Sequence, residues 1–174
     1  MKVNSLRTLS TFGQSVWLDF IRRGMFASGE LQRMIDRDGI SGITSNPAIF
    51  EKAINGSDDY RDAIQELAAA GKNNLEIYEA LVIEDVRTAA DFFEPTYFRT
   101  EARDGYVSLE VSPRLAHDAD GTVDEARRLW GAVDRPNIMI KVPATVAGLS
   151  AIETLIAEGI NVNVTLLFSL ERYR

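Results

Sequence analysis

The stretch NIMIKVPAT (residues 137–145) is an apolar run broken by a single lysine, Lys141. Because side chains alternate across a strand, Lys141 shares one face with Met139, and the opposite face is aliphatic. That aliphatic face carries Ile138, Ile140 and Val142. Burying an ammonium group is costly unless the group is paired or loses its proton. The stretch therefore predicts a buried strand on which Lys141 is either half of an internal ion pair or a reactive amine.

Similar short apolar runs occur along the whole chain. Together with the lysine stretch they predict strands near residues 16–20, 42–46, 106–111, 137–142 and 160–168. The segments between them carry apolar residues at helical spacing, and residues 47–93 are predicted to be almost wholly helical. Strands that alternate with helices indicate a parallel sheet covered by helices, which is either a closed (β/α)8 barrel or an open doubly wound sheet.

Side-chain alternation distinguishes these two architectures. In the other runs too, one face is aliphatic and the opposite face carries polar residues near the C-terminal ends of the strands. The polar row consists of Asp19, Thr44, Asn46, Glu110, Lys141, Asn163 and Thr165. Helices cover both faces of an open sheet and leave no room for such a row, whereas in a barrel it points inward at the mouth, where active sites lie. We therefore predict an α/β fold of the (β/α)8 TIM-barrel type, in which residues 1–174 form one incomplete domain with about the first five β/α units.

The predicted row brings one amine together with carboxylates, amides and hydroxyl groups, which suits carbonyl chemistry. An amine on a rigid strand can attack a ketone or aldehyde, and the carboxylates of Asp19 and Glu110 can move the protons that imine formation and carbon–carbon cleavage require. We expect no metal and no cofactor. The single histidine, His117, has no carboxylates at ligand spacing, SDDY (57–60) lacks the spaced acids of a calcium loop, and no phosphate-binding glycine loop is present.

Each of these residues also has a purely structural interpretation. An ion pair with Asp19 or Glu110 would explain Lys141 without any reaction. Either carboxylate would also serve as the N-cap of a neighbouring helix. Asn46 precedes Pro47, a pattern typical of a helix N-cap, and this role is compatible with substrate binding.

The composition argues against several classes of partner. The chain has 19 basic and 26 acidic residues, a net charge of −7, and no cluster of basic with aromatic residues, so nucleic acid is a poor candidate. The sequence contains no run of about 18 apolar residues, which is the length that would predict a membrane span. Its N-terminal segment lacks the apolar core of a signal peptide. Cysteine is absent. We expect a cytoplasmic protein with no nucleic acid and no membrane partner.

Five segments resemble, in order and spacing, sequence blocks of bacterial transaldolases. They are WLD (17–19), GITSNPAIF (42–50), LEVSPRLAHD (109–118), IMIKVPAT (138–145) and GINVNVTLLFS (159–169). The resemblance implies a (β/α)8 barrel and a Schiff-base enzyme of the pentose phosphate pathway. Such an enzyme transfers a dihydroxyacetone unit from sedoheptulose 7-phosphate or fructose 6-phosphate to an aldose phosphate, so sugar phosphates are the implied partners. The alternative within the same chemistry is a fructose-6-phosphate aldolase, which releases free dihydroxyacetone. The blocks are also similar to the transaldolase half of fusions with glucose-6-phosphate isomerase.

The same resemblance assigns roles to the polar row. Lys141 matches the Schiff-base lysine, and Asp19 matches the acid/base near the cleaved bond. Glu110 matches an acid/base that works through a water, which Thr165 helps to hold. The substrate-binding residues predicted from the row are Asn46 and Asn163, which match the substrate-orienting amides, and Thr44.

The length of the chain departs from the family pattern. A complete (β/α)8 barrel takes about 250 residues, whereas this sequence reaches SLERYR (169–174) where the helix after the fifth strand is expected. The resemblance places the phosphate-binding arginine and a substrate-contacting serine beyond that point. We therefore expect the N-terminal part of a transaldolase, with open strand edges that favour self-association or pairing with a C-terminal half. The competing prediction is a non-catalytic half-barrel fragment. The spare cations that are candidates for binding an anion are Arg22, Arg23 and Arg172, and nothing in the sequence places them at the barrel mouth.

Overall fold

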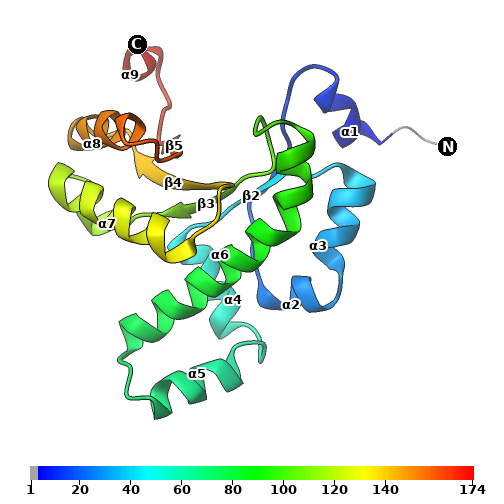
Figure 1. The fold of residues 1–174 in the computed structure, drawn as a ribbon, viewed down its shortest axis with the longest axis vertical. Coiled ribbons are helices and arrows are strands. Elements are labelled where there is room, and N and C mark those ends of the chain that lie inside the picture. Colours follow the sequence, from blue (N-terminus) through cyan, green and yellow to red (C-terminus); the bar gives the residue numbers. More distant parts are fainter. Residues whose placement is uncertain (1–3) are drawn as a thin grey trace.

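The computed structural model of this chain describes residues 4–174. Its centre is a sheet of five parallel strands in the order β1-β2-β3-β4-β5, so each strand pairs with its neighbours in sequence (Figure 1). The strands are β1 (Trp17–Leu18), β2 (Gly42–Thr44), β3 (Val107–Glu110), β4 (Ile138–Pro143) and β5 (Val162–Thr165). Four of the five predicted ranges contain one of these strands, β4 extends one residue beyond its range of 137–142, and the sheet curls into part of a barrel. The predicted α/β fold of barrel type is confirmed.

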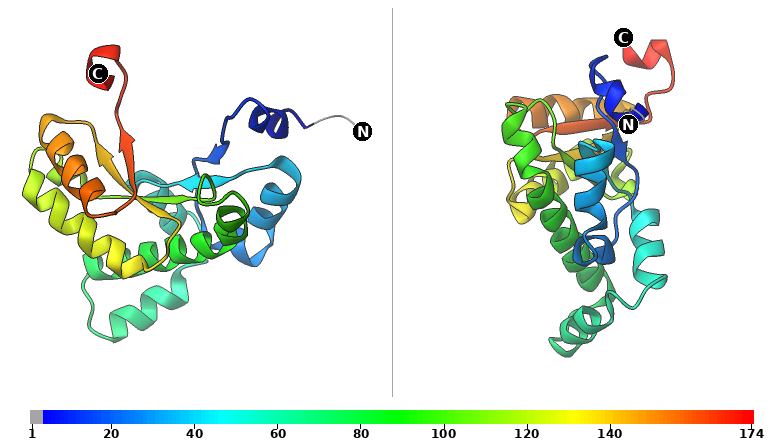
Figure 2. Two further views of the ribbon diagram at one scale, coloured as in Figure 1. Left: turned by 45° about the horizontal axis from the view of Figure 1, so that its top comes forward. Right: turned by 90° about the vertical axis from the view of Figure 1, so that its right-hand side faces the viewer.

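Helices connect the strands and follow the last one. The helical segments are α1 (Ser5–Ser10), α2 (Arg23–Ala27), α3 (Glu30–Arg33), the π-helical η1 (Met34–Asp38), α4 (Pro47–Asn55), α5 (Arg61–Ala69), α6 (Asn74–Arg99), the 3-10 turn η2 (Pro113–Leu115), α7 (Ala119–Val133), α8 (Val146–Ala157) and α9 (Leu170–Tyr173). Figure 2 shows α6, α7 and α8 along one side of the curled sheet, while α1 and α9 rise on the other side. None of the helices in the described residues is long and apolar enough to span a membrane.

The core lies between the outer face of the sheet and the helices packed on it. The aliphatic face predicted for β4 is wholly buried there, with Ile138, Ile140 and Val142 each 0% exposed. Helices α6, α7 and α8 pack on β3, β4 and β5. The wholly buried helical partners include Val86, Ala126, Val133, Ala151 and Leu155. Burying one aliphatic side chain of this size contributes about 1.5–3 kcal/mol, so this layer stabilises the order of the strands.

The segment predicted as almost wholly helical, residues 47–93, is divided into three helices. Helix α4 ends at Asn55 before Gly56, and α5 ends before the Gly71 turn, where φ is +82°. Helix α6 then begins with a capping box formed by Asn73 and Glu76. Because glycine adopts positive φ without steric cost, Gly71 allows the chain to reverse between α5 and α6.

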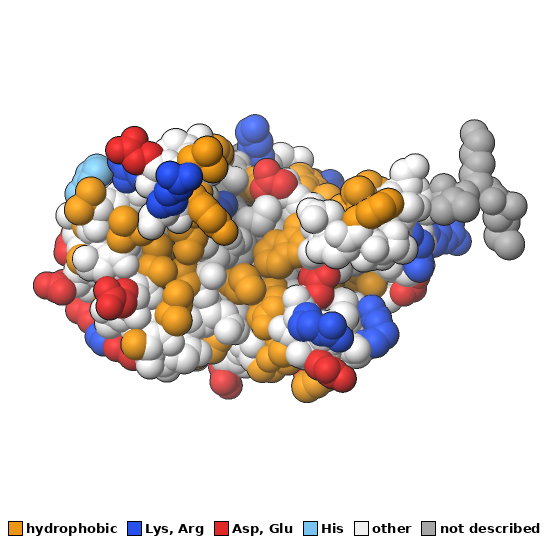
Figure 3. Space-filling view, turned by 90° about the horizontal axis from the view of Figure 1, so that it is seen from above, with side chains coloured by type: hydrophobic (Ala, Val, Ile, Leu, Met, Phe, Trp, Pro, Cys, Tyr) orange, Lys and Arg blue, Asp and Glu red, His pale blue; other side chains and the backbone are white. Residues whose placement is uncertain are grey.

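The two edges of the sheet are less covered than its outer face. Among residues 4–174, β1 pairs only with β2 and β5 only with β4, so the sheet does not close. Large apolar side chains that follow β5 are exposed, namely Leu166, Phe168, Leu170 and Tyr173. Figure 3 shows hydrophobic side chains gathered across the middle of one face of the molecule. The half-barrel is therefore open at the edges of its sheet in the described residues.

Candidate functional site

Lys141 lies on the inner face of β4, as the alternation of the strand predicts. Its side chain is 13% exposed, and its Nζ lies 3.4 Å from Oε2 of Glu110 on β3. The same Nζ donates a hydrogen bond of 3.4 Å to the backbone carbonyl of Ser45, just beyond β2. Of the two carboxylates predicted as ion-pair partners, Glu110 therefore forms the pair. The arrangement accounts for the charge of Lys141 and leaves its amine beside a group that can exchange protons with it.

The register of the sheet places Lys141 between two other polar residues. The Cα of Glu110 is paired with that of Lys141 across β3 and β4. The Cα of Lys141 is paired with that of Asn163 across β4 and β5. Residues paired in this way share a face in a parallel sheet, so Glu110, Lys141 and Asn163 form a single row.

Hydroxyl groups on and just beyond β2 and β3 form hydrogen bonds next to this row. Ser108 is 0% exposed, and its Oγ lies 3.0 Å from the Oγ1 of Thr44, to which it donates a hydrogen bond. The hydroxyl of Ser45 donates to the backbone carbonyl of Ser108 at 2.8 Å. These bonds tie β2 to β3 next to the ion pair, and they engage Thr44, which was predicted to bind substrate.

Asn46 is the N-cap of α4, as its position before Pro47 predicts. Its Oδ1 accepts a hydrogen bond of 3.0 Å from the backbone N–H of Ile49. The side-chain Nδ2 donates no hydrogen bond to residues 4–174. The cap fixes the amide at the end of β2. The amide nitrogen Nδ2 is not used by the cap, and the predicted contact of Asn46 with substrate stays a prediction.

Thr165 and Asp19 lie at the ends of the two edge strands. Thr165 is the last residue of β5, is paired with Pro143, and accepts a 2.8 Å hydrogen bond through its backbone carbonyl. Asp19 follows β1 directly and is exposed. Its carboxylate makes no hydrogen bond or ion pair within the described residues. The described chain thus brings Glu110, Lys141 and Asn163 together and leaves Asp19 apart from them, with β2 and β3 between β1 and β4.

The alternative roles of the two carboxylates as N-caps are wrong. Helix α2, which follows β1, begins at the N-cap Arg22 and has no side-chain cap. The turn η2 after β3 begins at Ser112, whose own hydroxyl accepts the capping hydrogen bond. Neither Asp19 nor Glu110 therefore supports a helix terminus.

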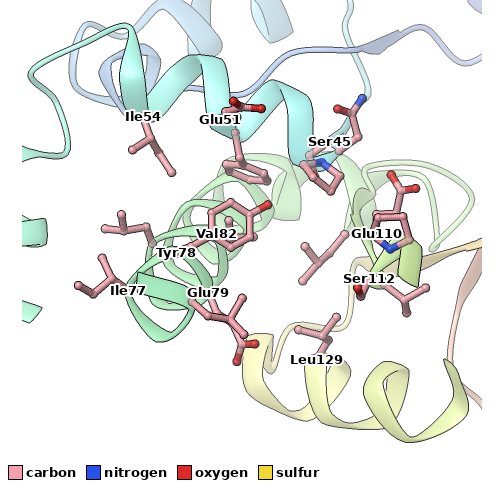
Figure 4. A pocket seen from close by; sticks show the side chains of 18 of the residues that line it. Ser45, Glu51, Ile54, Ile77, Tyr78, Glu79, Val82, Glu110, Ser112 and Leu129 are labelled. Atoms are coloured by element: carbon pink, nitrogen blue, oxygen red, sulfur yellow. The ribbon is translucent and has the colours of Figure 1, made fainter. Parts of the chain in front are cut away.

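A cavity of about 670 Å³ lies behind Glu110, between α4, α6 and α7. Its lining is mainly apolar and includes Phe50, Tyr78 and Leu129, and Glu110 and Asn46 are the predicted site residues that reach it. Figure 4 shows Tyr78 projecting from α6 into this space, with Glu110 on the opposite side. Burial raises the pKa of the Tyr78 hydroxyl, and the charge of Glu110 raises it further. Lys141 does not line the cavity. Glu110 therefore borders the cavity and also contacts Lys141 on the inner face of the sheet.

Two of the three cations left without a partner in the sequence form hydrogen bonds in the structure, whereas Nε of Arg22 lies 3.8 Å from Oδ2 of Asp59 and makes no hydrogen bond within the described residues. The guanidinium of Arg23 bonds to Asp85 at 2.9 Å and to Glu84 at 2.6 Å. Arg172 donates to the carbonyl of Ala144 at 2.9 Å. Within residues 4–174, no group of three or more histidine, cysteine, aspartate or glutamate side chains is arranged to hold a metal ion.

Sequence reasoning missed Ser45 and Tyr78 at this site. Ser45 lies within the segment GITSNPAIF, but the atom that meets Lys141 is its backbone carbonyl, which every residue type has. Tyr78 follows the apolar spacing of its helix, and only the packing of α6 beside β3 brings its hydroxyl toward Glu110. The available signal for Tyr78 was a hydroxyl group on an otherwise apolar helix face.

Comparison with known proteins identifies the family. The sequence model of the family described as transaldolase/fructose-6-phosphate aldolase matches residues 16–174. A transaldolase of Thiobacillus denitrificans is 52% identical over 97% of this chain and 47% of its own length. The protein named transaldolase 2 of Nostoc punctiforme is 50% identical over 99% of this chain and 45% of its own length. A transaldolase of Saccharopolyspora erythraea is 51% identical over 100% of this chain and 47% of its own length. The chain spans about half the length of these relatives, and it belongs to the transaldolase/fructose-6-phosphate aldolase family.

Proposed function

We propose that this chain provides the Schiff-base half of a transaldolase active site. The proposed enzyme transfers a dihydroxyacetone unit from sedoheptulose 7-phosphate or fructose 6-phosphate to an aldose phosphate, as in the pentose phosphate pathway. The observation that carries the proposal is the amine of Lys141, held on a strand 3.4 Å from the Glu110 carboxylate in a chain of this family. The proposal treats residues 1–174 as a single, incomplete barrel domain.

In the proposed reaction, Nζ of Lys141 attacks the C2 carbonyl carbon of the ketose phosphate. The carbonyl oxygen leaves as water, and an imine forms. The C3–C4 bond then breaks, its electron pair moves into the imine to give an enamine, and the proton of the C4 hydroxyl passes to a carboxylate. The first aldose phosphate leaves, the enamine carbon attacks the aldehyde carbon of the acceptor, and the carboxylate returns its proton to the aldehyde oxygen, which becomes the new C4 hydroxyl. Hydrolysis of the new imine releases the product and restores Lys141.

The proposal assigns the proton transfers to two carboxylates. Glu110 exchanges protons with the amine during imine formation and hydrolysis, through a water near Thr165, and its contact with Lys141 supports this role. Asp19 takes the proton of the C4 hydroxyl, an assignment supported by the family resemblance. The residues proposed to hold the hydroxyl groups of the sugar are Thr44, Asn46 and Asn163.

A fructose-6-phosphate aldolase remains the second candidate, because the family description names both activities. The two reactions share the imine and differ in the fate of the enamine. An aldolase protonates the enamine and releases free dihydroxyacetone, whereas a transaldolase keeps it until an acceptor arrives. Product analysis with fructose 6-phosphate, with and without erythrose 4-phosphate, separates the two activities. Release of dihydroxyacetone at many turnovers without acceptor would favour the aldolase.

Reductive trapping tests the shared step. Sodium borohydride and fructose 6-phosphate are added to the native protein, by which we mean the complete enzyme whose Schiff-base half we propose residues 1–174 to be. The modified lysine is then identified by peptide mapping. We expect one adduct, on Lys141, and none in Lys141→Met. The exposed Lys52 on α4 provides a matched control, because Lys52→Met should still form the adduct. An adduct on a different lysine would overturn the assignment.

The cytoplasmic location expected from the sequence stays a prediction.

A further inference from the structure

A buried charged network lies away from Lys141, in the layer of helices. Asp85 on α6 is 1% exposed, and each of its carboxylate oxygens accepts a hydrogen bond. Oδ2 accepts from the hydroxyl of Tyr60 at 2.7 Å, and Oδ1 accepts from Nε of Arg23 at 2.9 Å. Burial raises the pKa of the Asp85 carboxyl, and these two partners offset part of that shift. A buried ion pair of this kind is weak evidence for stability, because apolar residues often replace one without loss.

The same network holds the backbone at the start of α2. The hydroxyl of Tyr60 accepts a hydrogen bond of 3.1 Å from the backbone N–H of Arg23. The carboxylate of Asp59 accepts one of 3.1 Å from the N–H of Gly24. A side chain at position 24 would collide with this carboxylate, since a Cβ there would lie 2.6 Å from Oδ2 of Asp59. Because the N-cap residue Arg22 has no side-chain cap, the loop before α5 satisfies two of the free N–H groups of α2, those of Arg23 and Gly24.

We call this set of residues the clamp. It consists of Arg23, Asp59, Tyr60 and Asp85. Asp59 and Tyr60 belong to SDDY (57–60), the acidic segment that lacks calcium-loop spacing. In the structure this segment binds the start of α2 and Asp85 on α6. The guanidinium of Arg23 also lies over the ring of Tyr60, at 5.0 Å from its centroid. The clamp thus joins three segments that are distant in sequence: the start of α2, the loop between α4 and α5, and the middle of α6.

The clamp closes one end of a short connection that carries Asp19. Strand β1 ends at Leu18 and α2 begins at Arg23, so residues 19–22 span the distance between them. At one end Leu18 pairs with Ile43 of β2, and at the other end Arg23 lies in the clamp. Between them Ile21 is 0% exposed. The carboxylate of Asp19 has no partner in the described residues, so its position depends on the backbone of this connection.

We propose that the clamp positions Asp19 for its proton transfer. This proposal rests on the proposed function, because Asp19 has a role only if the bond cleavage takes place. Strand β1 has two residues and sits at the edge of the sheet, so its pairing with β2 alone constrains the connection weakly. A second anchor four residues beyond Asp19 restricts where that carboxylate can lie. The clamp residues are positioning residues, and they act through the backbone of residues 19–22.

The first test replaces the hydroxyl that links the parts of the clamp. In the native protein, Tyr60→Phe removes the acceptor for the Arg23 N–H and the donor to Asp85, and it keeps the ring beneath the guanidinium. We expect kcat for transfer to fall about 10- to 100-fold with little change in KM, because small misplacement of a reacting group has effects of this size. The rate of adduct formation on Lys141 should stay unchanged, because imine formation does not use Asp19.

A double-mutant comparison separates positioning from a general structural effect. If the clamp acts through Asp19, then Tyr60→Phe should cause no further loss in the residual activity of Asp19→Asn. An equal fall in both backgrounds would overturn the proposal. The control is Glu84→Gln, which removes a largely exposed partner of the same arginine and should change kcat less than about twofold.

A third measurement does not depend on any reaction. Amide hydrogen exchange over residues 18–24 should become about tenfold faster in Tyr60→Phe and stay unchanged in Glu84→Gln. Asp85→Asn provides a second variant if Tyr60→Phe does not fold, with the same expected result. Unchanged exchange in the clamp variants would overturn the clamp, whereas absence of an adduct on Lys141 in the unmodified protein would overturn the proposed function.

Discussion

Lys141 and Glu110 face each other across neighbouring strands, with Nζ of the lysine 3.4 Å from Oε2 of the glutamate and their Cα atoms paired in the β3–β4 register. Their side chains are 13% and 20% exposed. Because both residues belong to strands, the sheet sets the separation of their Cα atoms. The pair neutralises a largely buried charge and is also suited to proton transfer.

We predict that Glu110→Gln inactivates the native protein without unfolding it. Glutamine keeps the shape of the side chain and loses the ability to move a proton, and loss of a general acid/base costs about 10²- to 10⁴-fold in rate. A coupled assay with fructose 6-phosphate and erythrose 4-phosphate measures this loss. Urea unfolding should show a folded protein that has lost about 1–3 kcal/mol, because the ammonium group of Lys141 is largely buried and loses its charged partner. Glu153→Gln on α8 is the exposed control and should keep full activity. Activity of Glu110→Gln within twofold of normal would contradict the role of this carboxylate.

Turnover should survive removal of metal ions. In the proposed reaction the imine formed on Lys141 accepts the electron pair of the cleaved bond, which is the task a metal ion performs in metal-dependent aldolases. Dialysis of the native protein against EDTA should leave the transfer rate unchanged in the coupled assay. A loss of activity that added zinc restores would show that a different mechanism operates.

The protein should lose stability at alkaline pH through its buried tyrosines. Burial raises the pKa of Tyr60, Tyr78 and Tyr106. The charge of Asp85 adds to this effect at Tyr60, and the charge of Glu110 adds to it at Tyr78. Above pH of about 10 the unfolded chain releases these protons while the folded chain keeps them. The unfolded state then binds fewer protons, so the free energy of unfolding falls as pH rises.

Urea unfolding at a series of pH values from 8 to 11 (roughly the range around the tyrosine pKa) measures this dependence. The stabilising contribution is fully present below pH of about 10 and is lost as the pH passes upward through the raised values. Tyr60→Phe should make the decline shallower, whatever its effect on stability at neutral pH. The exposed Tyr173 supplies the control, and Tyr173→Phe should leave the slope as it is. An equal slope in Tyr60→Phe would contradict the prediction.

Residues 1–174 expressed alone should show no measurable transfer and should self-associate. The sheet leaves the free edges of β1 and β5 unpaired in the described chain, and unpaired strand edges pair with other chains. The side chains of Lys141 and Glu110 are 13% and 20% exposed beside a sheet that does not close, so they are not held in the fully dry, closed site that strengthens such interactions. Size-exclusion chromatography and the coupled assay test both parts. Adding the strands that complete the barrel as a separate polypeptide should restore some activity, whereas strong turnover by a monomer would show that closure is not needed.

The arrangement of the sheet could be predicted from the sequence because its signals are local. Alternation within NIMIKV (137–142) is enough to place Lys141 opposite the buried face of β4. The strand ends were less predictable, since β1 is reduced to Trp17–Leu18 and β5 to Val162–Thr165. Strand length depends on pairing with a neighbour, and the two edge strands have only one neighbour each in the described residues.

The candidate site could be predicted only in part. The row of Glu110, Lys141 and Asn163 follows from alternation together with strand order, and the catalytic roles of its members stay predictions. The clamp could not be predicted, because Tyr60 and Asp85 lie 37 and 62 positions from Arg23 and no periodic pattern connects them. Only the folded arrangement of α2, α5 and α6 brings these side chains into contact.

The order of the strands also affects how the chain can fold during synthesis. Each strand pairs with the strand made just before it, and the longest of these connections is the one between β2 and β3, which holds α4, α5 and α6. Contacts between neighbouring segments form faster than contacts across long stretches of chain. Domains generally fold from the N-terminal end as they leave the ribosome. The half-barrel can therefore assemble strand by strand in the direction of translation, with β5 as the last of the described strands to join the sheet.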